Sequence, residues 1–77
     1  MIVKFELKVS DYFNGPSLWL HRGTLILPDQ TSDRKVIRTV KKALKLSDHS
    51  FKIEKTTDGW NIEPLHMIAV GFITIAF

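Results

Sequence analysis

The sequence predicts an α+β domain with a two-layer ββαββ fold, in which one amphipathic helix packs on one face of an antiparallel sheet. Two observations lead to this prediction. Extended segments with alternating apolar and polar residues lie on both sides of a single segment with helical periodicity. The 77 residues, 44% of them apolar, are enough for one domain, residues 1–77, with a small core.

The first two extended segments are predicted to form a hairpin. Residues 2–10 alternate between apolar and polar side chains, which predicts a strand with one buried face and one wet face. Residues 11–17 contain Asn-Gly-Pro and are expected to form the connecting turn. The aromatic residues Tyr12 and Phe13 either fold back over the edge of the core or form an exposed contact at the tip of the turn.

The second strand, residues 18–27, has a broken alternation. Its first two leucines share one phase, and its last two leucines share the other. A β-bulge at Arg22-Gly23 would insert one residue and bring all four leucines to one face, and glycine suits the left-handed position of a bulge. We therefore expect a bulge there. Without it, Trp19 and His21 would share the core face with the last two leucines.

Residues 33–47 are predicted to form the only helix. Ser32, or Thr31, is expected to cap its N-terminus. The last turn has no glycine, so we expect the helix to stop near residue 47, either frayed or closed by Asp48 or His49. Its apolar side chains fall within about 120° of arc, which is typical of a helix that faces a core. They are Val36, Ile37, Val40, Ala43 and Leu44.

The opposite side of this helix carries six cations and no acid. Residues 34–45 have a charge of +6, whereas the rest of the chain, with five cations and eight acids, has a charge of −3. Like charges three or four residues apart destabilise a helix by a few tenths of a kcal/mol per pair, roughly, so folding does not explain this face. The pattern favours a contact surface for an acidic partner, and the alternative is a solvated face that confers solubility. The six residues are Arg34, Lys35, Arg38, Lys41, Lys42 and Lys45.

A second hairpin is predicted around Asp58-Gly59, because this dipeptide between two extended runs favours a tight turn. The two runs are residues 51–57 and residues 60–63. A two-residue turn at this place pairs Thr57 with Trp60. Four apolar residues then share one face and can pack under the helix, namely Phe51, Ile53, Trp60 and Ile62.

The last extended segment, residues 65–77, is apolar on both faces, as strands are when both faces are covered. One helix covers only one face of a small sheet, so something else must cover the other. A second copy of the chain is the leading expectation, with self-association through Ile68, Val70 and Phe72. The alternatives are a central strand covered by loops of its own chain, and an edge strand covered by a different partner.

The sequence does not predict an enzyme, a metal site or a cofactor. It has no cysteine, and we do not expect His21, His49 and His66 to converge on a metal ion. The run Ser-Asp-His-Ser at residues 47–50 is too local to align a hydrolase triad. No glycine-rich phosphate loop or pair of catalytic carboxylates is apparent. The longest apolar run, residues 67–77, is shorter than the roughly 20 residues of a membrane-spanning helix, so we expect a cytoplasmic protein without a membrane partner.

The strand–strand–helix–strand–strand order resembles the ubiquitin-like β-grasp in topology, and together with the size it also resembles small phage-encoded inhibitors of host machinery. A conjugated modifier of the β-grasp family ends in Gly-Gly, whereas this sequence ends in FITIAF, so that role is not implied. The leading prediction is a non-enzymatic protein whose basic helix binds nucleic acid with little sequence specificity. An acidic protein surface is the other partner considered for this helix. The alternative function is an inhibitor or interaction module that blocks a host protein complex by direct contact.

Overall fold

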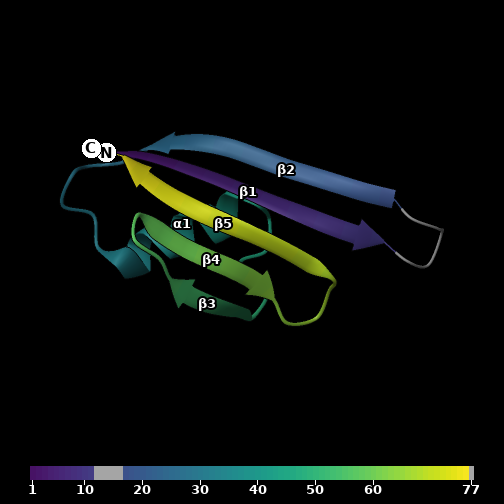
Figure 1. Cartoon of the computed structure of the whole chain (residues 1–77). Coiled ribbons are helices and arrows are strands. Elements are labelled where there is room, and N and C mark those ends of the chain that lie inside the picture. Colours follow the sequence, from purple (N-terminus) through teal and green to yellow (C-terminus); the bar gives the residue numbers. More distant parts are fainter. Residues whose placement is uncertain (12–16, 77) are drawn as a thin grey trace.

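The computed structural model is a five-stranded antiparallel sheet with one helix on one of its faces (Figure 1). It describes residues 1–11 and 17–76. The predicted turn with Tyr12 and Phe13 lies outside the described residues. In chain order the elements are β1 (Ile2–Asp11), β2 (Ser17–Ile26), α1 (Asp33–Ala43), β3 (Phe51–Lys55), β4 (Gly59–Pro64) and β5 (Ala69–Ala76).

This α+β architecture agrees with the prediction, but the order of elements does not. Three strands follow the helix, so the order is ββαβββ and not ββαββ. Each of the three extended segments after the helix forms a strand of its own, because a turn at residues 65–68 separates β5 from β4. The likeness to the β-grasp was drawn from the shorter order, which the chain does not have.

The last strand lies in the middle of the sheet, whose order is β2-β1-β5-β4-β3. β5 pairs with β1 on one side, from Ile2↔Ala76 to Val9↔Ala69, and with β4 on the other. The alternative in which this segment is an edge strand covered by a different partner is therefore wrong. A central position explains its apolar sequence on the helix side, because that side forms the middle of the core.

The pairing of β1 with β2 runs without interruption from Ile2↔Ile26 to Asp11↔Ser17, so the bulge predicted at Arg22-Gly23 is absent. Gly23 has another role, which is to make room for Phe5. A Cβ atom at Gly23 would lie 2.5 Å from the ring of Phe5. The glycine thus marks a close approach between neighbouring strands.

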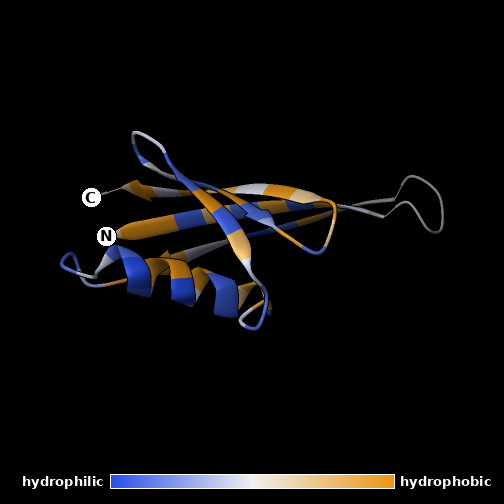
Figure 2. Cartoon of the chain, turned by 90° about the horizontal axis from the view of Figure 1, so that it is seen from below, coloured by the Kyte–Doolittle hydropathy of each residue, from blue (hydrophilic) through white to orange (hydrophobic). Residues whose placement is uncertain are grey.

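The core lies between the helix and the sheet, and Figure 2 shows the apolar side of α1 turned toward the strands. The helix contributes a stripe at every fourth residue, which is narrower than the predicted one. Ile37 is only half-buried and Ala43 is exposed. The buried apolar side chains are Val36, Val40 and Leu44 from the helical segment, and Val3, Phe5, Leu7, Trp60, Ile62, Ala69 and Ile73 from the sheet.

The ends of α1 are closed by different devices. At the N-terminus the Ser32 hydroxyl accepts a hydrogen bond from the backbone N–H of Lys35 (3.3 Å), as predicted. At the C-terminus Lys45 has φ 60°, and the N–H of Leu46 donates to the carbonyl of Lys41 (2.9 Å). This is a Schellman motif with lysine in the left-handed position, so the helix ends at Ala43 and not near residue 47.

The second hairpin forms, but its register differs from the prediction by two residues. Trp60 pairs with Lys55 and not with Thr57. A backbone hydrogen bond to the carbonyl of Gly59 (2.9 Å) closes the turn, whose central residues are 57 and 58. Gly59 packs against β5, where a Cβ atom would lie 1.8 Å from a backbone carbonyl oxygen. An even shift keeps each side chain on its predicted face, but Ile53 is 40% exposed and is not packed under the helix as predicted.

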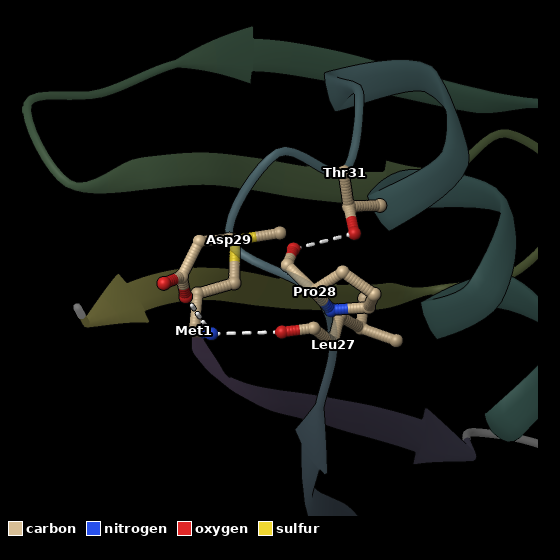
Figure 3. Close-up of polar contacts among 5 residues, drawn as sticks. All are labelled: Met1, Leu27, Pro28, Asp29 and Thr31. Atoms are coloured by element: carbon tan, nitrogen blue, oxygen red, sulfur yellow. Dashed lines mark hydrogen bonds and ion pairs between the residues drawn. The ribbon is translucent and has the colours of Figure 1, made fainter.

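Polar contacts fix the connection between β2 and α1 (Figure 3). The amino group of Met1 donates to the carbonyl of Leu27 (2.7 Å) and to the carboxylate of Asp29 (2.5 Å). The Thr31 hydroxyl donates to the carbonyl of Pro28 (2.6 Å). These bonds hold the connection beside the start of β1, from which the helix crosses the core face.

The two faces of β5 predict different sensitivities to truncation. Ile73 is 1% exposed under the helix, whereas Val70 is 60% exposed on the open face. Ile73→Ala should cost about 2–5 kcal/mol of unfolding free energy, because it leaves a cavity in the core. Val70→Ala should cost less than about 1 kcal/mol. Urea unfolding followed by circular dichroism measures both values, and equal losses would contradict the assigned faces.

The lysine in the left-handed position predicts a stabilising substitution. Lys45→Gly should raise the unfolding free energy by about 1 kcal/mol, because glycine adopts positive φ without steric cost. For a domain of this size the melting temperature should rise by roughly 4–8 °C. Lys45→Ala removes the same charge and keeps the strained backbone, so it should melt close to the wild type. Identical melting temperatures for the two variants would refute this account of the helix end.

Candidate functional site

The side of α1 that faces away from the sheet carries five of the six predicted cations. The buried stripe fixes the rotation of the helix about its axis, so the remaining positions must face solvent. Figure 2 shows this outward side as the hydrophilic side of the helix. We call these five residues the basic face. Arg34, Lys35, Arg38 and Lys42 are exposed, and Lys41 is half-buried.

Lys41 is held partly against the sheet. Its ammonium nitrogen lies 5.3 Å from the centroid of the Phe51 ring in β3. Near the other end of the helix, the ammonium nitrogen of Lys55 in β3 lies 4.4 Å from the ring centroid of Trp60. The same nitrogen lies 3.8 Å from the carboxylate of Asp33 in α1. The contacts of Lys41 with Phe51 and of Lys55 with Asp33 join both ends of α1 to β3. They also occupy the acid at the start of the helix, although an exposed pair of this kind contributes little stability.

Lys45 is exposed but does not belong to the basic face. The prediction placed it there by continuing the helical periodicity beyond the true end of the helix. Its backbone is left-handed, so its direction follows the turn after Ala43. Five of the six residues therefore lie on the helix itself, and the sixth lies in the turn after it.

The basic face has no acidic partner among the side chains that the structure describes. The ion pairs among the described side chains join Met1 to Asp29, Arg22 to Glu6 and Lys55 to Asp33, and none of them includes a cation of the basic face. The repulsion between like charges four residues apart, such as that of Arg38 with Arg34 and with Lys42, is thus not relieved by an acid. The uncompensated charge is available to an acidic ligand.

A groove of about 490 Å³ runs along this part of the helix. Its lining joins basic residues to the half-buried Ile37 and to Ser47, which sequence reasoning did not assign to the site. Ile37 could have been found from the helical wheel, because it lies where the apolar stripe meets the cations. Ser47 could not, because it comes close only through the turn that follows the helix. The residues that line the groove are Arg34, Ile37, Arg38, Lys41 and Ser47.

The open face of the sheet, opposite the helix, is the second candidate surface. Val70 is 60% exposed and Phe72 is 40% exposed on this face. Ile68 is exposed as well, but it lies in the turn before β5 and not in the strand. Val70 and Phe72 border a depression of about 400 Å³. Charged and polar side chains from β1, β3 and β4 surround it, namely Glu6, Lys8, Lys52, Glu54, Asn61 and Glu63.

Within the described ranges, no group of three His, Asp or Glu side chains lies close enough to bind one metal ion. No helix in that part of the chain is long and apolar enough to cross a membrane. Comparisons with protein-family models, curated proteins and solved structures found no match to this chain. The function must therefore be argued from the two surfaces themselves.

Proposed function

We propose that this protein is a non-enzymatic binding protein that engages nucleic acid, with little sequence specificity, through the basic face of α1. The observation that carries the proposal is the uncompensated charge of this face. Five cations lie on one side of an 11-residue helix, and no described acid pairs with them. Phosphates supply the missing charge, and their binding releases condensed counterions from the nucleic acid.

The composition of the basic face favours contact with the phosphate backbone over reading of bases. Three of its members are lysines, which act as point charges and form no bidentate pairs with base edges. The helix is about 16 Å long at 1.5 Å per residue, which is enough for several phosphates. Arg34 and Arg38 are the members able to enter a groove.

The distribution of charge supports an oriented encounter. Residues 34–45 carry +6 and the rest of the chain carries −3, so a polyanion is attracted to the helix side. At physiological salt the Debye length is about 8 Å, so the local surface decides the contact and the net charge of +3 matters less. The basic face is therefore the expected point of first contact.

The proposal predicts the salt dependence of binding to a labelled duplex of random sequence. With five phosphate contacts, log affinity should fall with log salt at a slope of up to about −4.5. The variant Arg38→Gln/Lys42→Gln should make the slope shallower by about 1.8. The matched control Lys4→Gln/Lys8→Gln removes the same charge from exposed positions of β1 and should keep the wild-type slope. Fluorescence anisotropy across a salt series measures all three slopes.

Two results would reject the proposal. One is a folded wild-type protein that binds neither DNA nor RNA at low salt. The other is an equal loss in the two double variants, because net charge alone would then explain the affinity.

A second candidate function is an interaction module or phage-type inhibitor that blocks a host protein complex. The observation that favours it is the exposure of Val70 and Phe72 beside the depression on the open face. A protein partner bound there should be lost in Val70→Ser/Phe72→Ser and retained in Arg38→Gln/Lys42→Gln. Affinity capture from the native host, analysed for protein and for nucleic acid, compares the two functions directly.

A further inference from the structure

The two edges of the sheet differ in their protection against pairing with another strand. β3 has only five residues, of which three are charged. β2 has ten residues, no proline and no bulge. Arg22 is its only lysine or arginine, and it already pairs with Glu6 (3.0 Å). Soluble proteins normally protect a long edge with charges, proline or bulges, so β2 is an edge open to strand addition.

The hydrogen bonds of β1 reveal which backbone groups of β2 point outward. The N–H of Leu27 donates to the carbonyl of Met1 (3.0 Å), and on the other side of β1 the N–H of Ser10 donates to the carbonyl of Ile68 (2.8 Å). Because antiparallel bonding alternates along a strand, the odd-numbered residues of β2 bond to β1. The even-numbered residues therefore present their N–H and C=O groups to the outside. Among the described elements, only β1 pairs with β2.

We propose that β2 pairs with β2 of a second copy of this chain, antiparallel, about a two-fold axis through Gly23. In this register Leu20 lies opposite Ile26 of the second copy, and Arg22 lies opposite Thr24 of the second copy. All outward backbone groups of residues 20–26 then meet a partner, which gives about eight hydrogen bonds. Each outward residue of β2 offers one donor and one acceptor, so two copies of this edge related by a two-fold axis are complementary.

Charge and exposure select this register. Moving the axis to Arg22 would place two guanidinium groups directly opposite each other, which is unfavourable. With the axis at Gly23, each Arg22 faces a neutral threonine. Leu20 and Ile26, which are 44% and 82% exposed, become cross-strand neighbours on the open face. The apolar side chains that the free edge leaves in water are thus matched with each other.

The two-fold symmetry also determines how the two basic faces are arranged. This part of the inference rests on the proposed function. A two-fold axis between antiparallel strands stands perpendicular to the sheet, so both helices lie on the same face of a continuous ten-stranded sheet. One nucleic acid molecule can then contact two basic faces. A monomeric variant should lose this doubling and show a shallower salt slope.

The first test is a proline at an outward position. The N–H of Thr24 points away from β1, so Thr24→Pro removes an edge donor without breaking the β1–β2 ladder. The control Thr24→Val keeps the N–H and a β-branched side chain. By sedimentation equilibrium, the wild type and Thr24→Val should have twice the 8.9 kDa chain mass. Thr24→Pro should have the single-chain mass with an unchanged far-ultraviolet circular dichroism spectrum.

The second test fixes the register by crosslinking. His21 lies opposite Leu25 of the second copy in a pair without hydrogen bonds, where Cα atoms are about 4.5 Å apart and suit a disulfide. Within one chain these positions are four residues apart, about 13 Å along the strand, and cannot join. The chain has no cysteine of its own. Oxidised His21→Cys/Leu25→Cys should therefore migrate as a covalent dimer, and each single variant as a monomer.

Three outcomes would overturn the proposal. They are a wild type that stays monomeric at the highest attainable concentration, a Thr24→Pro variant that remains dimeric, and a dimer that Phe72→Glu dissociates while Thr24→Pro does not. The last would assign self-association to the open face. A dimer that has the predicted crosslink but does not bind nucleic acid would support edge pairing and reject the function proposed for the helix.

Discussion

The structure depends on the burial of one face of the sheet by a single short helix. Val36 and Val40 are fully buried against the strands, where Val3, Leu7 and Ile73 are also almost inaccessible. The helix is about 16 Å long, whereas the molecule extends over 42 Å. The β1–β2 hairpin projects beyond the helix (Figure 2). The basic face, the open face of the sheet and the edge of β2 are the surfaces that this packing leaves exposed.

The elements that local pattern determines could be predicted from the sequence. The alternation in β1, the helical stripe and the cap at Ser32 each depend on neighbours within a few residues. The glycines could not be interpreted in this way, because a glycine serves a turn, a bulge or a close approach equally well. Gly23 makes room for Phe5, and Gly59 approaches β5. Both contacts join residues more than ten positions apart in the sequence, beyond the reach of local pattern, so the predicted bulge and hairpin register were wrong.

The candidate site likewise combines features that local pattern determines with features that depend on residues far apart in the sequence. The cations of the basic face could be found on a helical wheel, because burial of the opposite stripe fixes their direction. Lys45 could not, because a left-handed residue after Ala43 ends the periodicity that the wheel assumes. The role proposed for β2 depends on its position at the edge of the sheet, and the sequence alone does not reveal this strand order. The apolar last segment suits a central strand and an edge strand alike, and only the pairing with β1 and β4 shows that β5 is central and β2 is not.

Edge pairing and the basic face are compatible because of where the helix lies. The buried side chains of α1 pack with core residues of β1, β5 and β4, so the helix lies over the middle of the sheet, whose central strand is β5. With strands about 4.8 Å apart, the two β5 strands of an edge-paired dimer are five spacings apart, so the two helices would be separated by about 24 Å. This separation exceeds the Debye length of about 8 Å at physiological salt, so the two basic faces repel each other little. Backbone hydrogen bonds would hold the proposed edge pairing, and their strength depends little on salt, whereas phosphate contacts weaken steeply as salt rises. Self-association should therefore persist at high salt, where nucleic acid binding is weak, and can be measured there by itself.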